Sequence, residues 1–118
     1  MKIVGTGSCL PQRVVSNDDL AAIMDTSDEW ISSRTGIRNR HIATTETTTS
    51  LACDAVKSAL QDAGIDGSEI ELIIAASVST DKIVPSLACQ IQAEIGAEGA
   101  VAFDINAACS GFLFGLAT

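Results

Sequence analysis

Aromatic residues are scarce in this sequence of 118 residues, and tyrosine is absent. Aromatic side chains make up 3% of the chain, whereas hydrophobic residues of all kinds reach 47%. The core must therefore be filled by alanine, valine, isoleucine and leucine, which is typical of proteins in which helices cover a sheet. The chain is long enough to bury such a core, so its composition predicts an α/β fold.

Basic residues are also few, because 7 lysines and arginines stand against 15 aspartates and glutamates, for a net charge of −8. This charge repels the phosphates of nucleic acids and anionic lipid headgroups, so we expect neither as a partner. No apolar run approaches the roughly 18 residues that cross a bilayer, and we recognise no signal peptide. These absences predict a soluble, cytoplasmic protein.

Cysteine pairs of the C-x-x-C type are missing, although the chain has four cysteines, Cys9, Cys53, Cys89 and Cys109. With a single histidine, His41, the sequence lacks the ligand spacing of a zinc site, so we expect no metal. The chain is not a small, cysteine-dense scaffold, which favours free thiols in a reducing compartment over disulfides.

Apolar periodicity is clear in the second half of the sequence and predicts helices that alternate with strands. The predicted elements are a helix over 49–63 that Gly64 ends, a strand within 69–78, a helix with Pro85 in its first turn that Gly96 ends, and a strand over 101–105. The nearly unbroken apolar character of 69–78 predicts a strand covered on both faces. The helix between the two strands implies a parallel crossover.

The first third of the chain carries weaker signals. Residues 2–7 are typical of a short strand that enters a glycine turn. Ser16 is placed to cap a short helix, and Thr26 with Glu29 has the spacing of a capping box that starts a second helix, ending before Gly36.

Residues 103–112 place Cys109 where a strand turns into a helix among the small residues Ala107, Ala108, Ser110 and Gly111. Free N–H groups at a helix start favour the thiolate over the thiol and can face a developing oxyanion. The competing interpretation is a small buried apolar residue, the commoner role of a free cysteine. Position alone leaves both open for Cys109, whereas a structural role is favoured for the other three cysteines.

Six blocks of the sequence resemble β-ketoacyl-acyl-carrier-protein synthase III in order and spacing, and together they span the chain. The blocks are residues 5–11, 25–31, 34–38, 40–43, 85–92 and 102–109. The pair Asp28-Glu29-Trp30 and Arg34-Thr35-Gly36-Ile37 is close to specific for this branch of the condensing enzymes. It favours synthase III over hydroxymethylglutaryl-CoA synthase and type III polyketide synthases, which share the fold and the cysteine.

The resemblance implies a thiolase-like fold, in which two similar α/β halves each contain a mixed, mostly parallel sheet covered by helices. Residues 1–118 would form most of the first half and stop inside the nucleophile helix, in a protein that is a homodimer. Cys109 would take an acyl group from acyl-CoA, and condensation with malonyl-acyl carrier protein would give 3-oxoacyl-acyl carrier protein in fatty acid synthesis. No cofactor is implied.

The resemblance also assigns roles to further residues. Trp30 and Arg34 would hold the adenine of coenzyme A between them, and Thr26 would contact the nucleotide. Val84 would reach across the dimer interface to close the acyl pocket, and its modest size predicts primers longer or more branched than acetyl. Without the resemblance, Trp30 is better interpreted as a core anchor, and Arg34 as a solvated helix charge.

The resemblance places a histidine and an asparagine needed for decarboxylation in the second half of the fold, so these 118 residues alone are expected not to condense. Two other functions are compatible with the sequence. One is a non-catalytic, truncated acyl-binding or assembly module, and the other is a priming enzyme of polyketide or other secondary metabolite synthesis. A reading frame that ends at Thr118 would favour the module. A redox-sensing thiol is a weaker alternative, because Cys109 has no neighbouring cysteine in sequence.

Overall fold

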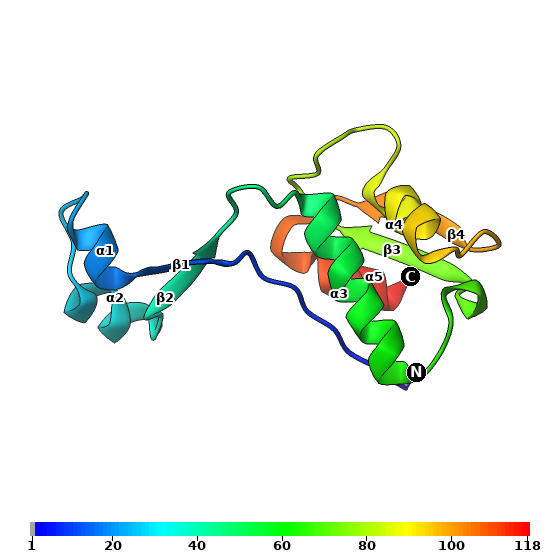
Figure 1. Cartoon of the computed structure of the whole chain (residues 1–118), viewed down its shortest axis with the longest axis horizontal. Coiled ribbons are helices and arrows are strands. Elements are labelled where there is room, and N and C mark those ends of the chain that lie inside the picture. The colour runs from blue at the N-terminus through cyan, green and yellow to red at the C-terminus, as the bar shows by residue number, and fades with distance from the viewer. Residues whose placement is uncertain (1) are drawn as a thin grey trace. The chain divides into compact units, whose positions relative to one another are not determined.

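The computed structural model describes residues 2–118, which divide into two compact units (Figure 1). Unit 1 contains the described residues up to Cys9 together with Thr47–Thr118, and unit 2 is Leu10–Glu46. Among the described residues, no helix is both long and apolar enough to cross a membrane.

Unit 1 is built around two parallel strands, β3 (Leu72–Ala76) and β4 (Val101–Ile105), with Leu72 opposite Val101. Helix α4 (Leu87–Ile95) connects them, and α3 (Thr48–Ala63) packs against α4 (Figure 1). The predicted parallel crossover is therefore confirmed. A 3₁₀ turn, η1 (Gly67–Glu69), lies between α3 and β3.

The helices of unit 1 begin and end at residues with the expected chemistry. Thr47 caps α3 and Ser86 caps α4, each accepting a backbone N–H with its side chain. Gly64 and Gly96 end these helices in the left-handed conformation that glycine adopts without steric cost. The prediction that Pro85 lies in the first turn is wrong by two positions: α4 begins at Leu87, and Pro85 precedes the cap Ser86 and follows a cis peptide bond.

The core of unit 1 is apolar and lies between the sheet and the two long helices. It consists of Cys53, Ile73, Ala75, Leu87, Ala88, Ile91 and Ala97. On the opposite face of β3, helix α5 (Gly111–Ala117) packs near Ile74. The predicted coverage of both faces is wrong at the two ends of β3, where Leu72 and Ala76 stay exposed.

Residues 2–9 are not a strand in this structure, so that prediction is wrong. The segment lies along α3: the N–H of Thr6 donates to the Asp62 carboxylate at 2.9 Å. A Cβ added at Gly7 would stand 2.1 Å from the carbonyl oxygen of Ala55, so only glycine allows this close approach. The strand-like pattern is present, but its backbone lies beside a helix, which offers no ladder of hydrogen bonds.

Unit 2 combines a pair of strands with two short helices. Its elements are β1 (Arg13–Ser16), α1 (Asn17–Ala21), α2 (Asp28–Thr35) and β2 (Asn39–Ile42), and the two strands are antiparallel. The sequence did not predict these strands. Ser16 caps α1 in a capping box with Asp19, as expected. At α2 the prediction is wrong by one residue, since Ser27 rather than Thr26 accepts the N–H of Trp30.

The centre of unit 2 is a polar side chain. Asn17 is 1% exposed, and its amide nitrogen donates to the Asp28 carboxylate at 2.7 Å and to the Ile37 carbonyl at 2.8 Å. Its amide oxygen accepts a hydrogen bond from Arg40, which also donates to the carbonyl of Val15. Arg40 is therefore part of this polar network.

Candidate functional site

Cys109 lies in the turn between β4 and α5, within a 3₁₀ segment η2 (Ala108–Ser110). The residue before it, Ala108, has a φ of 43°, in the left-handed region that alanine rarely adopts. This conformation costs about 1–2 kcal/mol, and strained backbone of this kind occurs at functional sites. The Cys109 thiol is exposed, so its interpretation as a buried apolar residue is wrong.

Gly111 brings the start of α5 close to β3, directly after the Cys109 turn. A Cβ added at Gly111 would stand 2.8 Å from the Cβ of Ala76, a distance that side chains essentially never show. Glycine at this position therefore permits the close packing that orients the turn toward the sheet.

Two backbone amides of the turn are already engaged. The N–H of Ser110 donates to the carbonyl of Ala107 at 3.0 Å, and that of Gly111 donates to Ala108. The N–H groups of Ser110 and Gly111 therefore form hydrogen bonds within the turn, at the helix start where the sequence predicted free N–H groups.

An open apolar cavity of about 940 Å³ borders Cys109. Its lining comes from α3, β3 and α5 and includes Ala52, Leu72, Ile74, Phe112 and Leu116. The cavity can therefore receive an aliphatic group next to the thiol.

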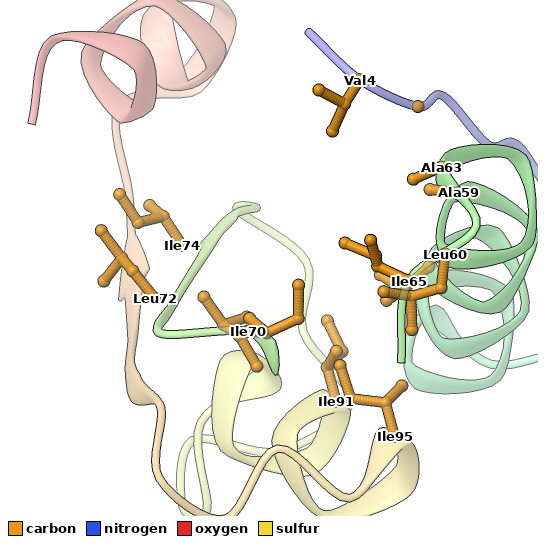
Figure 2. Close-up of a pocket in the computed structure, with 13 residues that line it drawn as sticks. Val4, Ala59, Leu60, Ala63, Ile65, Ile70, Leu72, Ile74, Ile91 and Ile95 are labelled. Atoms are coloured by element: carbon orange, nitrogen blue, oxygen red, sulfur yellow. The ribbon is translucent and has the colours of Figure 1, made fainter. Parts of the chain in front are cut away.

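A second hollow, of about 310 Å³, shares Leu72, Ile74 and Ile91 with the cavity beside Cys109. Figure 2 shows hydrocarbon side chains around it, contributed by Val4, by α3 and by α4 among others. The apolar space beside β3 therefore continues from the Cys109 turn toward Val4 and Gly5.

The other cysteines have structural surroundings. Cys53 is buried in the core, and burial raises the pKa of its thiol. Cys89 is half-buried, with its sulfur 3.9 Å from the Ala102 carbonyl oxygen, and Cys9 is half-buried as well. Of the four thiols, that of Cys109 alone is exposed.

Trp30 and Arg34 lie one turn apart on α2 in unit 2. The guanidinium carbon of Arg34 stands 4.6 Å from the centre of the Trp30 ring, and its nitrogen donates to the Trp30 carbonyl at 3.3 Å. Trp30 is 55% exposed, so it is not a core anchor. Arg34 is exposed, as expected of a helix charge, and it also stacks on the indole as a cation–π pair.

Two hollows flank Trp30. One, of about 360 Å³, is lined by Asp25, Thr26, Ser27 and Trp30, and the other, of about 270 Å³, reaches Arg34. Trp30 therefore lines one hollow together with Thr26 and the other together with Arg34. The gap between indole and guanidinium is closed, however, so a ring can enter there only if the Arg34 side chain moves away.

The remaining candidate residues have distinct surroundings. Val84 lies in unit 1 on the loop between β3 and α4 and is 83% exposed. His41 lies on β2 in unit 2 with its Nδ1 2.6 Å from the Pro11 carbonyl oxygen, which gives it a structural contact. Among residues 2–118, no three His, Cys, Asp or Glu side chains gather as metal ligands.

The sequence analysis did not identify Ala108 as a residue of special conformation at the candidate site. Its place in a run of small residues was noted, but nothing in the residue type marks a positive φ. A glycine there would have signalled it.

No family model matches this sequence. The fold is nevertheless that of the thiolase-like condensing enzymes. The crystal structure of 3-oxoacyl-[acyl-carrier-protein] synthase III from Aquifex aeolicus superimposes with a TM-score of 0.94 at 52% identity, covering 98% of this chain and 38% of that one. A priming β-ketosynthase of a polyketide pathway superimposes with a TM-score of 0.92 at 40% identity, covering 98% of this chain and 35% of that one.

The sequence points to one member of this class. The chain is 54% identical over 117 residues to β-ketoacyl-[acyl-carrier-protein] synthase III of Streptococcus sanguinis. The matched residues cover 99% of this chain and 36% of that protein. The chain therefore corresponds to the N-terminal portion of a β-ketoacyl-acyl-carrier-protein synthase III and spans little more than a third of the length of such relatives.

Proposed function

We propose that this chain supplies the acyl-accepting cysteine and part of the coenzyme A site of a β-ketoacyl-acyl-carrier-protein synthase III. The observation that carries the proposal is the exposed Cys109 on a strained strand-to-helix turn, beside an apolar cavity. The identity of 54% to a curated synthase III supports the same chemistry.

In the proposed first step, the Cys109 thiolate attacks the thioester carbonyl of acyl-CoA. The new carbon–sulfur bond forms as the bond to coenzyme A breaks, and coenzyme A leaves as its thiolate. Covalent catalysis of this kind divides one difficult condensation into two easier transfers. The aliphatic tail would lie in the cavity of about 940 Å³, whose apolar lining favours hydrocarbon over water.

In the proposed second step, malonyl-acyl carrier protein loses carbon dioxide, and the resulting carbanion attacks the Cys109 thioester. The products are 3-oxoacyl-acyl carrier protein and the free thiolate. The synthase III resemblance assigns decarboxylation to a histidine and an asparagine of the second half of the fold. The single histidine of the chain, His41, is engaged with Pro11 in unit 2.

Trp30 is the proposed platform for the adenine of coenzyme A. An exposed indole offers a flat face on which a base can stack. The hollow beside it also contains Thr26 and the carboxylate of Asp25. An uncharged base with an amino donor suits this setting, whereas a phosphate would be repelled there. When the base stacks on the indole, the Arg34 side chain would move away from the indole. The guanidinium would then either cover the other face of the base or bind a phosphate of coenzyme A.

Mass spectrometry of the full-length protein tests the acyl transfer. Incubation with acyl-CoA should add one acyl group, and Cys109→Ala should abolish the adduct. Cys9→Ala, which removes a half-buried thiol of unit 1, is the matched control and should keep it. No adduct on the unmodified protein, or an adduct that survives Cys109→Ala, would refute the proposal.

Tryptophan emission tests the adenine site, because Trp30 is the sole tryptophan of the 118 residues. Titration of the chain with coenzyme A should change this emission, and 3′-dephospho-coenzyme A should do so as well if the base is what stacks. Arg34→Lys should weaken binding less than Arg34→Ala. Identical emission with and without coenzyme A would contradict stacking on Trp30.

A second candidate is the priming step of a polyketide pathway, favoured by the similarity to the priming β-ketosynthase at a TM-score of 0.92. The two functions share the acylation of Cys109 and differ in the carrier protein that brings the malonyl group. Rates with malonyl groups on a fatty-acid and on a polyketide carrier protein separate them.

A further inference from the structure

Helix α2 carries Trp30 and Arg34, yet apolar burial does not hold this helix in unit 2. None of its residues, Asp28–Thr35, all of which the structure describes, is buried. A helix of 8 residues is also too short to be stable in water through its own hydrogen bonds. The position of Trp30 therefore depends on polar contacts at the two ends of α2.

Asn17 of α1, the helix beside α2 (Figure 1), makes contacts at both of these ends. Its amide nitrogen donates to the carboxylate of Asp28, the first residue of α2, at 2.7 Å. The same nitrogen donates to the carbonyl of Ile37 at 2.8 Å, two residues beyond the end of α2. One NH₂ group therefore joins the start and the end of the segment 28–37, which carries Trp30.

Asn17 is itself fixed by the strand pair of unit 2. Its backbone N–H donates to the carbonyl of Arg38 at 3.1 Å. Its amide oxygen accepts a hydrogen bond from Arg40 of β2, and Arg40 also donates to the carbonyl of Val15 of β1 at 3.0 Å. Asn17 is 1% exposed, so little water competes for these bonds. The Asn17 side chain therefore links the two strands to α2.

The Asp28 end of this link lies beside one of the hollows at Trp30. That hollow, of about 360 Å³, is lined by Asp25, Thr26, Ser27 and Trp30, which lie on either side of Asp28 in sequence. A change in the direction of α2 at Asp28 would therefore move Trp30 relative to Thr26. A stacking surface that is already in place binds a base more tightly than one that must first be ordered.

We propose that Asn17 is a positioning residue for nucleotide binding, which holds α2 so that Trp30 can stack on the adenine before coenzyme A arrives. This inference rests on the proposed function, and in particular on the adenine platform at Trp30. It adds a buried residue that does not touch the nucleotide and acts through α2.

The test compares two acyl donors on the full-length protein, acyl-CoA and the same acyl group on N-acetylcysteamine, a thioester without a nucleotide. The readout is the ratio of their rates of Cys109 acylation below saturation. Asn17→Ala should lower this ratio about tenfold, the effect of leaving α2 correctly placed in about a tenth of the molecules. Titration of Trp30 emission with coenzyme A should show a loss of affinity by the same factor, independently of acylation.

The matched control is Val15→Ala, which removes a buried apolar side chain from unit 2 and keeps the backbone carbonyl that Arg40 binds. Val15→Ala should lower the urea midpoint of unit 2, as Asn17→Ala does, and leave the rate ratio unchanged. Asp28→Asn keeps an oxygen that accepts from Asn17, so it should retain most of the ratio, whereas Asp28→Ala should lower it.

A double-mutant cycle with Trp30→Ala shows whether Asn17 acts through the indole. In the Trp30→Ala background, Asn17→Ala should have almost no further effect on the ratio of the two rates. An effect of Asn17→Ala that persists in full without the indole would contradict the positioning role.

Failure of the inference can be told apart from failure of the proposed function. If Trp30 emission responds to coenzyme A but Asn17→Ala leaves both the affinity and the ratio unchanged, this inference is wrong and the proposed function stands. Equal losses in Asn17→Ala and Val15→Ala would also overturn it, since stability alone would then explain them. No response of Trp30 emission to coenzyme A would overturn the proposed adenine site and the inference together.

Discussion

Units 1 and 2 are stabilised by opposite kinds of interaction. In unit 1, seven buried residues form one apolar cluster between the sheet and the helices. In unit 2, the buried residues are Val15 and Asn17, and the amide of Asn17, a residue of α1, forms hydrogen bonds with Asp28 of α2, with the Ile37 carbonyl and with Arg40 of β2. The candidate nucleophile therefore rests on an apolar core, and the candidate nucleotide platform rests on a polar network.

This difference has a physical consequence. Apolar burial is non-directional and scales with area, so unit 1 tolerates small shifts at a gradual cost. A buried hydrogen-bond network is directional, and removing one member leaves its partners unsatisfied. The two units should therefore respond to mutation in different ways.

The largest expected effect is in unit 1. Ile91→Ala removes a side chain that is 4% exposed and should lower the free energy of unfolding by about 3–4 kcal/mol through lost burial and a cavity. Ile91→Val should cost about 1 kcal/mol. Amide exchange in α3, α4 and β3 would measure the stability of unit 1, and Trp30 emission would report the stability of unit 2. If Ile91→Ala lowered both stabilities equally, the two units would unfold as one, which would contradict the difference described above.

The next effect is in unit 2. Asn17→Ala should destabilise this unit by about 2–3 kcal/mol, since Asp28, Ile37 and Arg40 all lose a buried partner. Asn39→Ala, at an exposed position of β2, is the control and should be nearly neutral. Urea unfolding followed by Trp30 emission measures both. Equal midpoints for the two variants would contradict a polar core.

The two units should also separate in substrate recognition. If Val84 closes the acyl pocket, as the resemblance implies, Val84→Phe should shorten the pocket and slow acylation by longer acyl-CoAs about tenfold while acetyl-CoA is little affected. Trp30→Ala, in unit 2, should instead weaken all acyl-CoAs alike. Initial rates across a series of chain lengths distinguish these patterns. A strict acetyl preference of the unmodified protein would contradict the role given to Val84.

The smallest expected effect is on the stability of unit 2 at low pH. Glu46 accepts N–H groups of Gln12, Thr44 and Thr45 in unit 2, and these bonds, that of Gln12 first, lower its pKa from 4.5 to about 2. A carboxyl with a lowered folded-state pKa stabilises the fold above its unfolded pKa, and this stabilisation is lost as pH falls toward 2. Glu46→Gln should therefore make the stability of unit 2 depend less on pH between about pH 5 and 2. Trp30 emission under urea at several pH values measures the slope, and an unchanged slope would contradict this role.

Prediction from sequence succeeded where local patterns and packing agree. The ends of α3 follow from apolar residues at helical spacing and from Gly64, and β4 follows from a short apolar run. The turn at Cys109 was predicted from its small neighbours. Its left-handed Ala108 was not, because nothing in the residue type alanine marks a positive φ.

Prediction failed where the partner lies far away in the chain. The pairing of β1 with β2 joins mostly polar segments without clear alternation. Asn17 resembles any polar residue in a first helical turn, although its partners include Ile37 and Arg40. The carboxylate of Asp104 lies in a strand, and no local pattern indicates that it binds the start of α4.

Peptide mapping of the acylated protein tests the central claim most directly, because all four thiols compete within one molecule. After brief exposure to acyl-CoA, the thioester should be found on the peptide that contains Cys109 and not on those with Cys9, Cys53 or Cys89. Acyl groups spread over several cysteines, or a Cys109 peptide that stays unmodified, would contradict the account.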